Sequence, residues 1–208
     1  MKLVLFGATG HTGAYILDEA LKAGHEVTVL VRHPEKLRQQ SDRLTVMTGD
    51  ALKEQDVSAA IKGQDAVLSA ISEGPEIQHK TQTLATGNMI RAMQQNGVER
   101  IICMGASGIL QFNDTELIRD QPSYDPLYRP LSYEHSSVNK QLQQTDLKWT
   151  QVCPPTILAA PSDGKFAVKA DYPPTEIPDV SAGNIGAFMM QELEKKEFIG
   201  KRVGITNA

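Results

Sequence analysis

The stretch FGATGHTG, residues 6–13, decides the fold that we expect for this chain. The run Lys2–Phe6 before it is mostly apolar and partly β-branched, which is typical of a buried parallel strand. The run Ala14–Lys22 after it places apolar residues at helical spacing. Three glycines, each three residues from the next, therefore lie on a turn that leads from a strand into a helix.

Each of the three glycines would serve a different purpose at such a turn. Gly7 can adopt a tight turn that a Cβ would resist, and Gly10 lets backbone N–H groups come close to a ligand. Gly13 lets the helix pack tightly against the strand. The helix N-terminus then offers free N–H groups and a positive dipole end to a pyrophosphate. An ordinary turn rich in small residues is the alternative, but in this strand–turn–helix context the motif predicts dinucleotide binding.

The composition is that of one globular domain. The chain has 208 residues, 40% of them hydrophobic, so we expect a single α/β domain over residues 1–208 with a small C-terminal elaboration on the substrate side. The net charge of −4 gives no support to nucleic-acid binding. No apolar run is long enough to span a membrane, and no charged leader precedes the first strand. We expect a cytoplasmic monomer or homodimer whose partner is a small molecule.

Cysteine and histidine placement predicts neither a redox pair nor a metal site. Both cysteines, Cys103 and Cys153, fall inside apolar strand-like runs, so we expect buried, reduced thiols rather than a disulfide. His11 lies inside the glycine turn, where its ring would face phosphates or solvent. None of the other histidines shows metal-ligand spacing: His25, His33, His79 and His135.

Predicted strands alternate with predicted helices along the chain. Apolar runs predict strands at residues 2–6, 26–31, 44–48, 66–71, 100–104 and 149–153. Helical spacing predicts helices at residues 14–22, 35–40, 53–61, 81–96, 134–145 and 180–194, with Ser181 as N-cap of the last. This alternation is typical of a doubly wound parallel sheet, the Rossmann fold, which binds ligands at the carboxyl ends of its strands.

Two irregular segments interrupt the alternation. Residues 109–131, which follow the fifth strand, contain three prolines and three aromatic residues. Residues 160–178 follow the sixth strand. Loops of such length usually serve a function, for example as lids. We therefore expect both segments to lie over the substrate cleft.

The end of the second strand indicates which dinucleotide binds. Enzymes that select NAD commonly place a carboxylate there, on the ribose hydroxyls. This chain has Arg32 instead, and Glu35 comes only after Pro34. The guanidinium of Arg32 can hold a 2′-phosphate, and Lys36 can add a second positive charge. A solvated strand-end cation is the alternative, but we predict NADP(H).

Further strand ends supply further candidate cofactor contacts. Asp50, which closes the third strand beside Ala51, could accept a hydrogen bond from the adenine amino group, although a plain helix-capping role explains it nearly as well. Ala70 and Ile71, at the end of the fourth strand, belong to the same predicted cofactor-binding edge.

The usual acid–base pair of short-chain dehydrogenases is missing. Those enzymes use a tyrosine and a lysine four residues apart on one helix, where the ammonium lowers the pKa of the phenol. No tyrosine of this chain has a lysine four residues later. Lys140 lies two helical turns after Tyr133, about 10 Å along the axis, where coupling would be weak. Tyrosine-driven alcohol oxidation is therefore disfavoured, and Lys140 remains a candidate cofactor contact.

Ser107 is the candidate catalytic residue that remains. It follows the fifth strand and could donate a hydrogen bond to a substrate carbonyl or to the nicotinamide amide. A serine that satisfies the local turn is the alternative. Pro154 and Pro155 end the sixth strand and would lie beside the nicotinamide, unless they only terminate the strand.

These motifs together resemble a known family. The chain is similar to the atypical short-chain dehydrogenase/reductases, which include biliverdin reductase B, NADPH-dependent flavin reductases and NmrA-like regulators. The residues that carry the resemblance are the glycine turn, residues 29–32, 49–50 and 64–67, Ser107, and residues 147–149 with the two prolines. The resemblance implies that Thr9, Gly10, His11 and Thr12 cradle the pyrophosphate, Arg32 and Lys36 bind the 2′-phosphate, Ser107 stands beside the nicotinamide, and the Pro154 backbone orients its carboxamide.

One departure concerns the substrate. The biliverdin-type reductase has a histidine directly after the two prolines, where this chain has Thr156. An NADP-type cleft without an acid–base pair suits hydride transfer to an extended π system, so we predict an NADPH-dependent reductase of a flat conjugated acceptor, a free flavin or a quinone-like compound. A non-catalytic NADP-sensing regulator of the NmrA type is the alternative, and a sugar-nucleotide epimerase is disfavoured because it needs the missing tyrosine–lysine pair.

Overall fold

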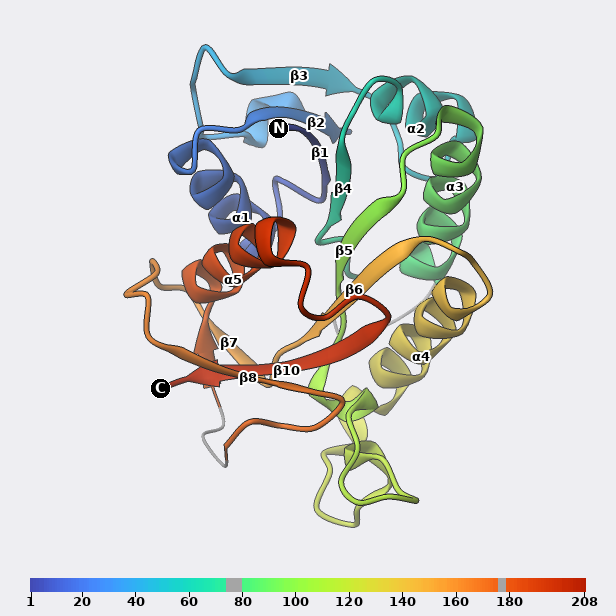
Figure 1. The fold of residues 1–208 in the computed structure, drawn as a ribbon, viewed down its shortest axis with the longest axis vertical. Coiled ribbons are helices and arrows are strands. Elements are labelled where there is room, and N and C mark those ends of the chain that lie inside the picture. The colour runs from blue at the N-terminus through green and yellow to red at the C-terminus, as the bar shows by residue number, and fades with distance from the viewer. Residues whose placement is uncertain (74–79, 176–178) are drawn as a thin grey trace.

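The computed structural model describes residues 1–73, 80–175 and 179–208. An eight-stranded sheet forms its centre, with strands in the order β3-β2-β1-β4-β5-β6-β10-β8. All neighbouring strands in it pair in parallel except β8, which is antiparallel to β10. This order confirms the doubly wound Rossmann fold (Figure 1).

Six of the eight strands in this sheet lie on the predicted apolar runs. The bounds of all eight are β1 Lys2–Phe6, β2 Glu26–Val31, β3 Leu44–Thr48, β4 Ala66–Ser69, β5 Arg100–Met104, β6 Lys148–Cys153, β8 Phe166–Ala170 and β10 Lys201–Asn207. A separate small sheet pairs β7 (Thr156–Leu158) with β9 (Asp179–Ser181).

Helices cover both faces of the large sheet (Figure 1). Their bounds are α1 His11–Lys22, α2 Glu54–Ile61, α3 Thr81–Asn96, α4 Arg129–Gln143 and α5 Ala182–Lys195. Helices α1 and α5 pack on one face and share a core with the sheet, whereas α2, α3 and α4 bury a second core on the other face. The Ser181 hydroxyl accepts a hydrogen bond from the Asn184 N–H at 3.1 Å, which confirms the predicted N-cap.

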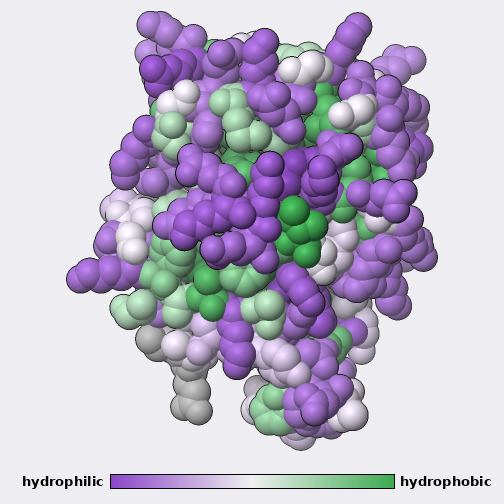
Figure 2. Space-filling view, in the orientation of Figure 1, coloured by the Kyte–Doolittle hydropathy of each residue, from purple (hydrophilic) through white to green (hydrophobic). Residues whose placement is uncertain are grey.

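Polar residues cover most of the face shown in Figure 2, and hydrophobic residues form small groups between them. No helix among the described residues is long and apolar enough to cross a membrane. Both cysteines are free and buried, as predicted. Burial raises the pKa of the Cys103 thiol to about 12, so the thiol stays protonated.

Several element predictions are wrong. The helix predicted from residue 180 begins only at Ala182, because residues 179–181 form β9. The predicted helix at residues 35–40 is only a short 3-10 helix, η1 (Pro34–Lys36), because its polar sequence has no apolar stripe to bury. Helix α4 begins at Arg129, earlier than predicted, because Pro130 occupies its first turn, where proline is tolerated. The segment 160–178 is not irregular, since it contains β8, and β10 was not predicted. These two strands stabilise each other through antiparallel pairing, which the local pattern did not reveal.

The segment between β5 and α4 projects at the bottom of Figure 1. It contains three short 3-10 helices, η2 (Ser107–Ile109), η3 (Ile118–Asp120) and η4 (Pro126–Tyr128). Arg119 ties it to α4, since its guanidinium donates to the Ser132 carbonyl at 3.1 Å. The last residues of the second predicted loop, 176–178, lie outside the described residues, as does His79.

Candidate functional site

The carboxyl ends of six parallel strands form one edge of the sheet. In spatial order they lead to Asp50 (β3), Arg32 (β2), the glycine turn (β1), Ala70 (β4), Ser107 (β5) and Pro154 (β6). Neighbouring strands lie about 4.8 Å apart, so this edge spans roughly 24 Å. The sheet thus brings most of the predicted site residues into one line, although they come from distant parts of the sequence.

The glycine turn packs directly against the end of β4. Gly7 has φ +84°, a conformation that favours glycine. A Cβ at this position would lie 2.7 Å from the Ala70 carbonyl carbon and 2.9 Å from the Ile71 nitrogen. The predicted contact residues Ala70 and Ile71 therefore border the turn through their backbones.

Gly10 and Gly13 are glycines for different reasons. A Cβ at Gly13 would lie 2.0 Å from the Gly7 carbonyl oxygen, so the chain itself requires glycine there. At Gly10 the nearest atom to a Cβ is the same oxygen at 3.2 Å, and the backbone is extended (φ −79°, ψ 168°). Contacts within the chain demand glycine far less at Gly10 than at Gly13. Its outer side is exposed, as is that of Thr9 and His11.

The N-terminus of α1 has the properties that favour a bound anion. Gly10 is its N-cap and supplies no side-chain acceptor, and the first turn contains no acidic residue. The first N–H groups of a helix need acceptors from outside the helix, and its dipole favours negative charge there. Thr12 is half-buried beside this exposed end. The site therefore fits the pyrophosphate of a dinucleotide.

The end of β2 carries the cation that the sequence singled out. Arg32 and Lys36 are both exposed, and Arg32 forms no ion pair with any described residue. The nearby carboxylate of Glu35 lies 3.1 Å from His33 Nδ1. The guanidinium of Arg32 is thus available for a phosphate, whereas Glu35 already has a partner.

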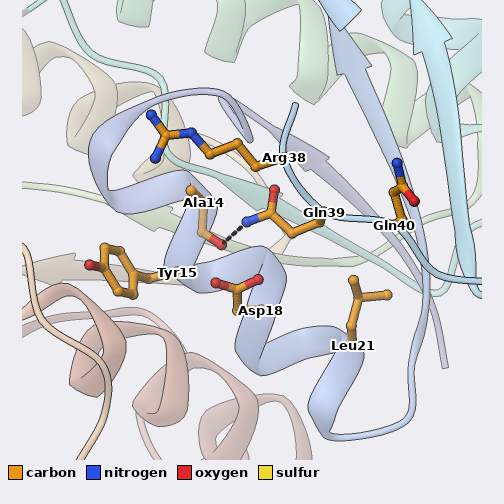
Figure 3. A pocket seen from close by; sticks show the side chains of 7 residues that line it. All are labelled: Ala14, Tyr15, Asp18, Leu21, Arg38, Gln39 and Gln40. Atoms are coloured by element: carbon orange, nitrogen blue, oxygen red, sulfur yellow. Dashed lines mark hydrogen bonds between the residues drawn. The ribbon is translucent and has the colours of Figure 1, made fainter. Parts of the chain in front are cut away.

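A hollow of about 520 Å³ lies between α1 and residues 38–40, which follow Arg32 closely in the sequence (Figure 3). Its lining residues come from the outer face of α1 and from the segment 38–40. Figure 3 shows Arg38 and Gln39 close to Ala14, with Asp18 and Leu21 further along the helix. The Gln39 amide donates a hydrogen bond to the Ala14 carbonyl at 3.2 Å. The sequence reasoning missed Arg38, because it assigned residues 35–40 to a helix.

Asp50 makes a local turn. Its Oδ1 accepts a hydrogen bond from the Leu52 N–H at 2.9 Å, and its own N–H donates to Asp56 Oδ2 at 2.9 Å. The Ala51 carbonyl accepts a hydrogen bond from the Asn88 amide at 2.9 Å. The helix-capping alternative for Asp50 is wrong, because the N-cap of α2 is Lys53 and no side chain caps that helix; the adenine contact of Asp50 stays a prediction.

Ser107 and Pro154 meet at the other end of the edge. The Ser107 N–H donates to the Pro154 carbonyl at 2.9 Å, which joins the ends of β5 and β6. The Ser107 hydroxyl is half-buried and makes no hydrogen bond to any residue that the structure describes. It is therefore free to donate to a bound carbonyl group.

The structure does not bring Lys140 to this edge. Lys140 lies in the last turn of α4, about 16 Å along the axis from the first residue of that helix, and it is exposed. Tyr133 is 57% exposed, and its ring stacks on Arg119 with 4.5 Å between the guanidinium carbon and the ring centroid. The cofactor contact predicted for Lys140 therefore remains without support from its position.

Two polar groups near the site were missed. Tyr124 is half-buried, and a Cβ at Gly108 would lie 2.4 Å from its hydroxyl oxygen, so the phenol lies next to η2. Burial raises the pKa of Tyr124. Glu134 is 5% exposed and accepts hydrogen bonds from the N–H groups of Gln82 and Thr83, at the first turn of α3. Neither residue has a sequence signal, because an irregular loop and a tertiary cap have no periodic pattern.

Helix α4, which contains Glu134, also carries a buried histidine. His135 is 3% exposed, and burial lowers its pKa to about 4, so the ring is neutral at physiological pH. No cluster of three or more metal-ligating side chains occurs among residues 1–73, 80–175 and 179–208.

A family model described as NAD(P)H-binding matches residues 7–196. The uncharacterized protein YwnB of Bacillus subtilis is 32% identical over 157 residues, which cover 74% of this chain and 71% of that protein. Several reductases and dehydrogenases are longer relatives, and the matches cover 26% to 40% of their length.

Solved structures share the whole fold. A Burkholderia pseudomallei protein, provisionally described as exported, has a TM-score of 0.84 and 25% identity, with 99% of each chain covered. A Streptococcus pneumoniae protein, provisionally described as an NADH-flavin reductase, has a TM-score of 0.81 and 24% identity, with all of each chain covered. At these identities the second likeness concerns the fold alone.

Proposed function

We propose, from the premise that this chain belongs to the NAD(P)H-binding family, that it is an NADPH-dependent reductase. Its acceptor would be a flat conjugated compound, a free flavin or a quinone-like molecule. The observation that carries the proposal is the line of strand ends, with an uncapped helix N-terminus at α1 and, after β2 and β5, an Arg32 guanidinium and a Ser107 hydroxyl that pair with no described residue.

The residues of this chain would position the reactants and exclude water. The α1 N-terminus would hold the pyrophosphate, and Arg32 would hold the 2′-phosphate. The Pro154 carbonyl already accepts the Ser107 N–H, but a carbonyl oxygen has a second lone pair for the nicotinamide carboxamide. The bound nicotinamide would supply a hydride, which is the cofactor's own chemistry.

A conjugated acceptor explains why no tyrosine–lysine pair is needed. Hydride transfer to an extended π system spreads the incoming charge over the rings. The protein then has to align the two rings more than to move a proton, and alignment alone can lower a barrier by several kcal/mol. The Ser107 hydroxyl would orient the acceptor carbonyl.

The experiment measures NADPH oxidation at 340 nm with flavin and quinone acceptors, after subtraction of the rate without protein. We expect turnover with at least one acceptor and a preference for NADPH over NADH. Background rates with flavin, quinone and tetrapyrrole acceptors would exclude the reductase. If NADP⁺ and NADPH then bind with clearly different affinities, the NADP-sensing regulator becomes the better explanation.

The cofactor choice depends on Arg32. Arg32→Ala should weaken NADPH binding by about 1.5 to 3 kcal/mol, because a charged hydrogen-bonded pair is lost, and should leave NADH binding nearly unchanged. Lys62→Ala removes the exposed cation that follows α2 and is the matched control. Equal losses for both cofactors would show that Arg32 does not contact the 2′-phosphate.

A further inference from the structure

A cavity of about 190 Å³ lies beside Ser107. Its walls come from η2, η3, the end of β6, the segment 173–175 and β10, so segments far apart in the sequence enclose it. Leu110, Ile118 and three prolines, Pro155, Pro173 and Pro174, form much of its lining. Rigid apolar walls of this kind favour a flat apolar ring.

No charged side chain is among the described residues that line this cavity. Cys153 is part of the wall, and burial raises the pKa of its thiol, so it contributes no charge. Arg202 lies close enough to act on that thiol, but its own charge is paired: Nε lies 3.3 Å from Asp171 Oδ1. A phosphate in this cavity would therefore be desolvated without a free cation to bind it.

The polar groups of the lining are few. The Thr175 and Thr206 hydroxyls hydrogen-bond each other at 3.0 Å. Ser107 is different, because its hydroxyl bonds to no described residue while its N–H is fixed on Pro154. Among the described lining residues, the Ser107 hydroxyl is the one without a hydrogen-bond partner, and such a donor suits one carbonyl oxygen.

The volume limits the size of the occupant. Pockets for drug-sized ligands measure about 300 to 1,000 Å³, and one water occupies about 30 Å³ in the liquid. The cavity beside Ser107 is smaller than such pockets and has room for one or two fused rings. A flavin nucleotide, with three rings and a ribityl phosphate, exceeds it.

We propose that this cavity binds an uncharged para-quinone of one or two rings, with one carbonyl oxygen on the Ser107 hydroxyl. This inference rests on the proposed reductase function and selects one acceptor class within it. The quinone gains a hydride from the reduced nicotinamide and a proton from water, and it leaves as the hydroquinone while the nicotinamide is oxidised.

The first test compares acceptors. Purified protein with NADPH is given 2-methyl-1,4-naphthoquinone, riboflavin or FMN, and kcat/KM is measured for each. We expect the naphthoquinone value to exceed the FMN value at least tenfold. If FMN is reduced and the quinone is not, this inference is wrong and the reductase function stands. If no acceptor is reduced, both are wrong.

The second test changes the cavity wall. Ile118→Lys places an ammonium group in the cavity and should raise KM for the uncharged quinone at least tenfold. KM for an anionic naphthoquinone sulfonate should rise less. Leu127→Lys is the matched control, because Leu127 belongs to the same projecting segment, is 52% exposed and does not line the cavity. Equal KM values for wild type and Ile118→Lys would place the acceptor elsewhere.

A third variant covers the case in which Ile118→Lys does not fold. Pro174→Trp, in the loop after β8, should fill the cavity with a side chain. Quinone reduction should then fall at least tenfold, while NADPH binding by calorimetry stays unchanged. Calorimetry with 1-tetralone, a two-ring ketone that is not a quinone, should show that Pro174→Trp also weakens the binding of this ketone. Undiminished quinone reduction by Pro174→Trp would overturn the inference.

Discussion

At the scale of single residues, the two glycines of the α1 N-terminus separate folding from binding. Gly13 is required by the Gly7 carbonyl, only 2.0 Å from where a Cβ would lie. Gly10 has an extended backbone and a more distant neighbour at 3.2 Å. The sequence motif does not distinguish the two positions, but their surroundings do.

We predict that Gly10→Val leaves the fold intact and abolishes cofactor binding, because two methyl groups then occupy the surface where the pyrophosphate would lie. Calorimetry with NADPH measures the affinity, and circular dichroism checks the fold. Gly13→Ala should instead lower the unfolding temperature strongly. Wild-type affinity in Gly10→Val would remove the dinucleotide site from this turn.

A second residue-scale prediction concerns Ser107. Ser107→Ala should lower kcat by roughly tenfold or less, the value of one neutral hydrogen bond. A proton relay would instead cost about a hundredfold or more. We expect the smaller loss, because no described side chain hydrogen-bonds the Ser107 hydroxyl and could adjust its pKa.

A double-mutant cycle with Lys140→Met tests the relay directly. We expect the losses in kcat to add, with a small contribution from Lys140, because it lies in the last turn of α4. A coupled relay would give a different result: each single variant would lower kcat strongly, and the double variant would have a kcat no lower than that of either single variant. That result would overturn the assignment of Ser107 as a positioning group.

At the scale of elements, a buried ion pair ties α5 to β5. Arg100 Nη2 lies 2.8 Å from Glu192 Oε1, and both side chains are almost fully buried. The Glu192 carboxylate also accepts hydrogen bonds from the Thr150 hydroxyl and from the N–H groups of Glu197 and Phe198. Arg100 begins β5, so this cluster lies at the edge of the sheet opposite the site.

We predict that Arg100→Met lowers the free energy of unfolding by about 3 to 5 kcal/mol, because it leaves a buried carboxylate without its cation. Arg100→Met combined with Glu192→Leu should lose less than the single variant. Urea unfolding measures both. NADPH affinity should stay unchanged in the folded variants. A loss below about 1 kcal/mol for Arg100→Met would mean that the pair contributes little.

At the scale of the whole molecule, buried histidines make stability depend on pH. Burial lowers the pKa of His135 to about 4, whereas in the unfolded chain the ring returns to its ordinary value near 6.5. The unfolded chain therefore binds a proton that the folded chain excludes. Above about pH 6.5 the ring is neutral in both states, so His135 does not lower the free energy of unfolding. As the pH falls from 6.5 toward 4, protonation of the unfolded chain lowers the free energy of unfolding.

We predict that His135→Gln removes most of this acid sensitivity, which amounts to up to about 3 kcal/mol at pH 4. Urea unfolding at pH 4.5, 6 and 7.5 measures the difference between wild type and variant. His33→Gln, at an exposed position, is the matched control and should follow the wild-type profile. Parallel pH profiles for wild type and His135→Gln would refute the prediction. Burial also lowers the pKa of His25, so some sensitivity should remain.

Features of this protein that depend on neighbouring residues could be predicted from the amino-acid sequence. Apolar runs located six strands, and the glycine spacing located the turn from β1 to α1, because a buried strand and a tight turn both restrict the residues that form them. The same reasoning placed Arg32, Ser107 and Pro154 at strand ends. It failed for β8, which pairs with β10, and for β10, which pairs with both β6 and β8.

The contacts of these residues with distant parts of the chain become visible in the folded structure alone. In the fold, Ala70 lies against Gly7, the Ser107 N–H donates to the Pro154 carbonyl, and Lys140 lies in the last turn of α4. The fold also encloses the cavity beside Ser107 between segments that lie up to about a hundred residues apart. The physical reason is that burial, pKa shifts and cavity walls arise from contacts between distant segments, and such contacts leave no periodic pattern in the chain.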